Sequence, residues 1–246
     1  MDRLLEATAR AERDHFWFRG FRRFVEPLLV EATRGVPGAR ILDCGCGTGH
    51  NLVMLRRYGR AVGIDITWRG LEFARGRGER LVAQASAAQL PFGDGTFDLV
   101  TSFDVIYALD DQTERAALTE IYRVLRPEGQ ILLNVAALKV LKGNHSVLSQ
   151  EVRRYHRGDL REKLTRAGFS VERMTYTHFT LLPLVMAVRF SQRLTGHKES
   201  DQEVTVPSAP VNTVLTALLG LEAAALRVTN MPLGSSLLAL GRKKRF

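Results

Sequence analysis

Residues 40–52 read Arg-Ile-Leu-Asp-Cys-Gly-Cys-Gly-Thr-Gly-His-Asn-Leu, and this stretch decides the fold. The apolar pair Ile41 and Leu42 is typical of the end of a buried strand, and Asp43 follows at its tip. Three glycines then alternate through a tight turn, at Gly45, Gly47 and Gly49. From position 48 the apolar residues recur at helical spacing. A strand, a glycine turn and a helix in this order are typical of a site that holds a nucleotide-like ligand over a helix N-terminus.

A second acid follows at a spacing that suits a nucleoside. Asp65 ends the apolar run 61–65, 22 residues after Asp43. An acid at the tip of the second strand can accept both ribose hydroxyls. The pattern acid-x-Gly-x-Gly-x-Gly, together with Asp65, resembles the nucleoside motif of the class I S-adenosylmethionine-dependent methyltransferases. The alternative is a tight turn without a ligand, which the agreement of motif, order and spacing disfavours.

The resemblance implies an α/β fold, a doubly wound Rossmann-like sheet of seven strands in the order 3-2-1-4-5-7-6 with strand 7 antiparallel. The apolar runs predict these strands at 39–43, 61–65, 81–84, 97–102, 130–135, 169–176 and 235–241. We expect residues 1–35 to form an N-terminal helical lid and residues 36–246 the methyltransferase domain. Within that domain, residues 179–232 are expected to be a helical insertion between strands 6 and 7, acting as a substrate cap or an oligomer interface.

Composition narrows the class of protein further. A chain of 246 residues can bury one core and carry an elaboration. Its net charge of +9 suits an anionic substrate, a membrane surface or nucleic acid. The arginines are dispersed, however, and the one dense basic cluster is at 242–245, so we expect no nucleic-acid partner. The N-terminus has no signal-peptide pattern, and no run of 18 apolar residues occurs, which predicts a cytoplasmic enzyme.

The cofactor expected from the resemblance is S-adenosyl-L-methionine. The residues expected to bind it lie in the glycine turn, at the strand tips and on the lid: Asp43, Gly45, Cys46, Gly47, Gly49, Asp65, Ile66, Ser86, Ala87, Phe103 and Arg19. Ser86 stands where the family often has Asp, and its hydroxyl can accept the adenine amino hydrogen bond more weakly. The N–H of Ala87 would serve the ring nitrogen. Arg19, or else Arg22 or Arg23, would meet the cofactor carboxylate.

Chemistry at the acceptor needs few groups. Methyl transfer from a sulfonium is an in-line displacement, so the protein chiefly aligns the reacting atoms. An oxygen or nitrogen acceptor also needs a base. The candidate catalytic residues are His145, His156, Asp104, Tyr107 and, from the lid, His15. A surface or packing role is the alternative for each histidine, and His145 is favoured because it lies in the loop after strand 5. Cys44 and Cys46 alone cannot complete a metal site, and we predict no metal.

The loop 142–157 and a second resemblance bear on the acceptor. A solvated basic face is the default interpretation of this loop, and the alternative is a site for a small molecule that carries a carboxylate or a phosphate. Residues 151–156 and the late apolar helices also resemble a bacterial subgroup of the family that is associated with sugar, lipid-linked or natural-product pathways. The acceptor atom is left open, and so is the choice between a monomer and a homodimer.

Two alternative functions stay open. An NAD-dependent oxidoreductase also uses a glycine turn and a ribose acid, although His50 stands where its third glycine should be. A non-catalytic protein of the same fold would bind a membrane surface through helices 179–194 and 211–228. Paired apolar helices are more often core or a dimer interface, yet peripheral membrane contact stays open.

Overall fold

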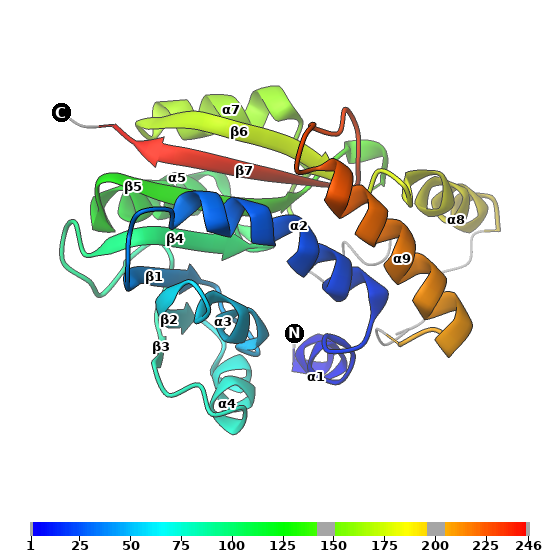
Figure 1. The fold of residues 1–246 in the computed structure, drawn as a ribbon, viewed down its shortest axis with the longest axis horizontal. Helices are drawn as coiled ribbons and strands as arrows, with labels where there is room; N and C mark the ends of the chain where they lie inside the picture. Colours follow the sequence, from blue (N-terminus) through cyan, green and yellow to red (C-terminus); the bar gives the residue numbers. More distant parts are fainter. Residues whose placement is uncertain (1, 142–150, 196–204, 245–246) are drawn as a thin grey trace.

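The computed structural model describes residues 2–141, 151–195 and 205–244. The strands are β1 (Ala39–Cys44), β2 (Gly59–Asp65), β3 (Val82–Gln84), β4 (Phe97–Phe103), β5 (Leu125–Ala136), β6 (Phe169–Thr177) and β7 (Ser236–Lys243). They form one sheet in the order β3-β2-β1-β4-β5-β7-β6, in which β7 runs antiparallel to β5 and β6 (Figure 1). The expected fold, strand order and antiparallel strand 7 are therefore confirmed.

Helices cover both faces of this sheet. They are α1 (Asp2–Ala11), α2 (Phe16–Ala32), α3 (His50–Leu55), α4 (Trp68–Gly76), α5 (Asp111–Val124), α7 (Arg157–Arg166), α8 (Leu182–Thr195) and α9 (Ala209–Ala225), with short 3-10 turns at Ile106–Ala108 and Lys139–Leu141. Ile41 of β1 packs in the core shared with α2, α3 and α9, whereas Leu42 packs in the core shared with α5 and α7. Successive strand side chains point to opposite faces, so a strand buried on both faces reads as a continuous apolar run.

Several boundaries differ from the predicted ones, and two of the differences have a clear cause in the backbone. β5 begins at Leu125 rather than at 130, because Leu125 already pairs with Phe97 before residues 126–129 interrupt the ladder. Helical spacing was expected from position 48, but α3 begins only after Gly49, whose φ of 77° is left-handed. Both differences arise where backbone with positive φ interrupts a regular pattern, which apolar periodicity does not report.

Helix α2 and the late helix α9 lie against each other (Figure 1). The side chain of Asn212, on α9, accepts the Phe16 N–H at 2.8 Å and donates to the Asp14 carbonyl at 2.8 Å. A Cβ on Gly20 would lie 2.4 Å from Leu219, so glycine lets α2 and α9 approach closely. The roles of residues 1–35 as a lid and of 179–232 as a cap stay predictions. Within the described ranges, no helix combines the length and apolar character needed to cross a bilayer.

Candidate cofactor and acceptor site

A cavity of about 840 Å³ opens at the carboxyl ends of the central strands. Its walls include the glycine turn after β1, the tip of β2, the segment after β4 and side chains of α1 and α2. In open α/β sheets, ligands bind outside the carboxyl ends of the strands where the strand order reverses. The cavity therefore lies where the fold predicts a ligand.

The glycine turn forms one wall, and its backbone is fixed by β2. The N–H groups of Gly45 and Cys46 both donate to the Ile64 carbonyl at 2.8 Å. Gly45 has φ 91°, and a Cβ there would lie 2.2 Å from the Val105 side chain. Gly47 has φ 49°, and a Cβ there would meet nothing within 4 Å. The turn thus needs glycine for close packing at one position and for positive φ at the other, and bare backbone faces the cavity.

Asp65 is held beside this turn by three hydrogen bonds. Its Oδ2 accepts the Gly47 N–H at 2.7 Å, while its Oδ1 accepts the N–H and hydroxyl of Thr67 at 2.8 and 2.5 Å. A carboxylate oxygen has two lone pairs, so acceptor capacity remains for a ligand hydroxyl. Ile66, which is 68% exposed, lines the cavity next to it and offers an apolar surface. This wall fits a nucleoside, with a polar group for the sugar and an apolar one for the base.

Asp43 occupies a different place from the other expected cofactor residues. It is buried beneath the turn and does not line the cavity. Its Oδ1 accepts the Thr101 hydroxyl at 2.7 Å, and its Oδ2 has no partner among the described residues. The pKa of the Asp43 carboxyl is raised to about 7, chiefly by burial and also by the nearby Asp65 carboxylate. The Thr101 hydrogen bond opposes this rise. Asp43 is therefore in a position to support the turn from below rather than to touch a ligand.

The next wall contains the expected adenine residues. Ser86 and Ala87 both line the cavity. The Ser86 hydroxyl accepts the Ala88 N–H at 3.2 Å, which leaves its own proton free to donate. Phe103 also lines the cavity, and its ring contacts that of Phe21 edge-on at 5.1 Å, joining β4 to α2. These three expected residues are thus brought to the same cavity as Asp65.

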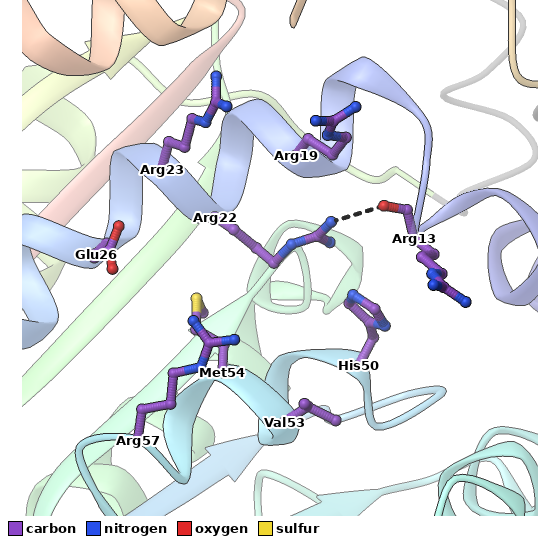
Figure 2. Close-up of a pocket in the computed structure, with 9 residues that line it drawn as sticks. All are labelled: Arg13, Arg19, Arg22, Arg23, Glu26, His50, Val53, Met54 and Arg57. Atoms are coloured by element: carbon purple, nitrogen blue, oxygen red, sulfur yellow. Dashed lines mark hydrogen bonds between the residues drawn. The ribbon is translucent and has the colours of Figure 1, made fainter.

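Helix α2 contributes Arg22 to the cavity, and Arg19 is not among the lining residues. Figure 2 shows Arg22 extending from α2 toward His50, while Arg19 lines a neighbouring pocket. Arg22 donates to the backbone carbonyls of Glu12 and Arg13 at 2.9 and 3.3 Å. Three residues along a helix turn it by about 300°, so the two side chains point about 60° apart. Of the arginines expected to meet the cofactor carboxylate, Arg22 is therefore the one that lines this cavity, and its contact with the cofactor stays a prediction.

Asp104 and Tyr107 line the part of the cavity that follows β4, which lies two strands from β2 in the sheet. Asp104 has φ 60°, unusual for a residue with a side chain, and its Oδ1 accepts the Asn134 amide at 2.9 Å. It is exposed in the cavity, and the protein atoms that line the cavity still remove water from around its carboxyl. This desolvation raises the pKa of Asp104 to about 7; the Asn134 hydrogen bond opposes the rise and the Glu151 carboxylate adds to it. A carboxyl that titrates near neutrality suits proton transfer.

The expected histidines are distributed differently. His15 lines the cavity, and its Nδ1 accepts the Trp17 N–H at 3.1 Å as the cap of α2; burial lowers its pKa. His156 is exposed at the start of α7 and does not line the cavity. His145 lies outside the described residues. The structure therefore brings together Asp104, Tyr107 and His15, and leaves His156 apart from them.

Three charged residues that line the cavity, Glu12, Glu151 and Arg154, were not among the site residues expected from the sequence. Both oxygens of Glu12 accept the Thr48 hydroxyl, at 2.9 and 2.7 Å, which ties the end of α1 to the glycine turn. The Arg154 guanidinium donates two hydrogen bonds to the Glu151 carboxylate, with N···O distances of 2.5 and 3.0 Å, and both residues line the cavity. The i,i+3 spacing of this pair was a signal for pairing, but the Glu12 contact spans 36 residues and has no local signal. In the described part of the chain, no group of three or more His, Cys, Asp or Glu could hold a metal ion.

Comparisons with known proteins agree with this geometry. A profile described as a methyltransferase domain matches residues 42–133. An O-methyltransferase of Aspergillus nomiae is 31% identical over 166 residues, which cover 60% of this chain and 71% of the relative. A Mycolicibacterium smegmatis protein assigned to the S-adenosylmethionine-dependent methyltransferases is 29% identical over 163 residues, covering 65% of this chain and 61% of that relative. The chain thus spans less than two thirds of the second relative.

A solved structure extends the likeness over the whole chain. It is a methyltransferase from Haloferax volcanii in complex with the Trm112 methyltransferase activator, with a TM-score of 0.59 at 21% identity, covering 98% of each chain. At that identity, the likeness shows a shared fold and carries nothing about substrate or partner.

Proposed function

The chain belongs to the class I S-adenosylmethionine-dependent methyltransferases, and on that premise we propose that it transfers a methyl group from S-adenosylmethionine to a small-molecule acceptor. One observation carries the proposal: a single cavity is lined by Asp65, at the tip of β2, and by Asp104 and Tyr107, which follow β4 on the other side of β1. Its volume of about 840 Å³ lies within the range of small-molecule sites. A donor and a small acceptor would therefore share one enclosed space.

The chain's own residues would hold the donor by familiar interactions. When bound, S-adenosylmethionine supplies a methyl group already activated on a positively charged sulfur. Asp65 accepts hydrogen bonds from the ribose hydroxyls, and Ile66 and Ala87 provide an apolar surface and an N–H for the base. Arg22 is the cation that lines the cavity near the glycine turn, and it suits a carboxylate. The helices that roof the cavity exclude water, which strengthens each of these contacts.

Asp104 is the base in this proposal. An acceptor O–H or N–H would pass its proton to the Asp104 carboxylate as the acceptor attacks. A pKa of about 7 keeps much of the carboxyl ionised at neutral pH while leaving it basic enough to take a proton. The Asn134 amide, 2.9 Å from Oδ1, orients the carboxylate. Tyr107 and His15 then serve to position the acceptor.

The acceptor in this proposal need not be anionic. The basic loop was the reason to expect a carboxylate or phosphate, but its described arginines are engaged by protein. Arg153 pairs with Asp111 at 2.9 Å and with Glu114, and Arg154 pairs with Glu151. Arg157 donates to the Met174 carbonyl at 3.0 Å. Paired charges of this kind offer less to a ligand, so a hydroxyl- or amine-bearing small molecule fits as well.

Calorimetry separates this proposal from the oxidoreductase alternative. We expect purified protein to bind S-adenosylmethionine at one site and to give no heat with NAD; the reverse result would refute the assignment. Co-sedimentation with anionic liposomes tests the membrane alternative, and we expect the protein to stay in the supernatant. Turnover is then measured as S-adenosylhomocysteine formed with a panel of small hydroxyl and amine acceptors, with mixed tRNA as a parallel arm. Product formed with tRNA alone would overturn the small-molecule acceptor.

A further inference from the structure

A second pocket of about 590 Å³ lies between α2 and α3, beside the cofactor cavity (Figure 2). Five arginines and one carboxylate supply its charge: Arg13, Arg19, Arg22, Arg23, Arg57 and Glu26. Arg22 and His50 line both this pocket and the cofactor cavity. Nothing in the proposed methyl transfer uses the other four arginines.

Among the residues that line this pocket, arginines outnumber carboxylates. Glu26 is the one acid in its lining, and it accepts the Tyr58 hydroxyl at 3.3 Å. Arginine stays protonated at any physiological pH, so five guanidinium groups face one carboxylate. The field is evident at His50, whose pKa is lowered to about 4 by burial and then by the nearby Arg22, Arg77 and Arg13.

Two of these arginines, Arg19 and Arg57, differ from many others in the described part of the protein in their hydrogen-bond partners. Elsewhere, arginines pair with carboxylates, as Arg56 does with Glu79 at 2.9 Å and Arg126 does with Asp98 at 2.7 Å. Arg23, in the pocket, donates to a backbone carbonyl at 3.1 Å. The side chains of Arg19 and Arg57 make no hydrogen bond or ion pair with the residues that the structure describes. Arg19 lies on α2 and Arg57 follows the end of α3, so the pocket has an arginine without a partner among the described residues in each of two segments that line it.

We infer that this pocket binds a small molecule that carries a diphosphate or longer phosphate chain, at a site separate from the methyl donor. Guanidinium groups recognise phosphate oxygens through two parallel hydrogen bonds, which lysine or histidine cannot reproduce. A single phosphate carries about −1.5 to −2 charges at neutral pH and would leave much of the excess unbalanced, whereas two phosphates balance it. The volume admits such a group with an attached small moiety.

Inorganic pyrophosphate is the probe for this site. We expect the wild-type protein to bind pyrophosphate by calorimetry, more tightly than orthophosphate, and to lose affinity as salt rises because the interaction is between exposed charges. The double variant Arg19→Gln/Arg57→Gln removes the two free guanidinium groups. We expect its affinity for pyrophosphate to fall by about a hundredfold, since a hydrogen bond to a charged group contributes about tenfold or more.

A matched variant controls for net charge. Arg34→Gln/Arg60→Gln removes the same two charges from exposed positions that do not line the pocket, and we expect its pyrophosphate affinity to stay within about twofold of wild type. Binding of S-adenosylmethionine to both double variants is measured alongside as a check of the fold, and it is independent of the pyrophosphate result. An equal loss in both double variants, or no binding by the wild type, would overturn the inference. Full competition between pyrophosphate and S-adenosylhomocysteine would overturn the inference as well. The same holds if single-stranded RNA, and not pyrophosphate, bound in a way that depends on Arg19 and Arg57.

Discussion

Replacement of Asp65 by asparagine tests the donor site most sharply, because the carboxylate of Asp65 has two tasks. It accepts three hydrogen bonds from Gly47 and Thr67, at 2.5 to 2.8 Å, and in our proposal it also accepts the ribose hydroxyls. The asparagine amide keeps one acceptor oxygen and puts an NH₂ where the other stood. That NH₂ faces either the Gly47 N–H or the Thr67 donors, so two donors oppose each other.

The magnitude follows from these contacts. A donor left without a partner costs about 1–3 kcal/mol, and loss of a hydrogen bond to a charged group costs about 1.5–3 kcal/mol. The first cost is present with and without the ligand, so it lowers the free energy of unfolding, whereas the second applies only when the donor is bound. We therefore expect Asp65→Asn to bind S-adenosylmethionine about 10- to 150-fold more weakly in calorimetry and to have a lower thermal midpoint.

A matched control isolates the site from the chemical change. Asp94→Asn alters an exposed carboxylate that pairs with Arg123 at 2.7 Å and does not line the cavity. We expect its affinity for S-adenosylmethionine to match wild type. If Asp65→Asn bound the donor within threefold of wild type, the ribose role of Asp65 would be refuted.

Three further predictions follow from the same site. Asp104→Asn should lower turnover by about a hundredfold or more, with the affinity for the donor unchanged. Wild-type turnover should fall as the pH drops below about 7, because the Asp104 carboxyl then becomes protonated. A flat pH profile would contradict the role of Asp104 as the base. The pKa of Asp43 lies at about 7 in the fold and at 3.8 when unperturbed, so its neutral form stabilises the fold and this contribution is lost as pH rises through 7. The thermal midpoint of wild type should therefore fall more between pH 5 and 8 than that of Asp43→Asn, and parallel curves would count against this burial. Gly45→Ala should lower the free energy of unfolding by about 2–5 kcal/mol, because it adds the 2.2 Å clash with Val105 to a positive φ. Gly47→Ala should lower it by about 1–2 kcal/mol, because only the positive φ is unfavourable there. Chemical denaturation measures both values, and equal losses would be inconsistent with the packing.

The elements that could be predicted are those whose signal is local. The glycine turn, Asp65 and the strands carry their pattern within a few residues, and the strand order followed from the family resemblance. The start of β5 was placed five residues late because Leu125 pairs with Phe97 ahead of an interruption that breaks the apolar run. Apolar periodicity reports burial, and it does not report where a ladder hydrogen bond begins.

The contacts that could not be predicted are those made across the fold. Glu12 meets Thr48 only because α1 folds back over the turn. Arg22 rather than Arg19 lines the cavity because of the rotation of α2, which depends on how that helix packs against α9. The excess charge between α2 and α3 was likewise hidden, because its arginines are spread over residues 13–57 and look dispersed in the sequence. Chemistry assembled from several elements requires the tertiary structure.

The most direct test of the methyl-transfer assignment is a crystal structure with S-adenosylhomocysteine. We expect both ribose hydroxyls within hydrogen-bonding distance of the Asp65 carboxylate, the amino-acid carboxylate near Arg22, and the sulfur facing the space in front of Asp104 and Tyr107. A ligand seated elsewhere, or a sulfur pointing away from Asp104, would contradict the proposed division of this cavity into a donor end and an acceptor end.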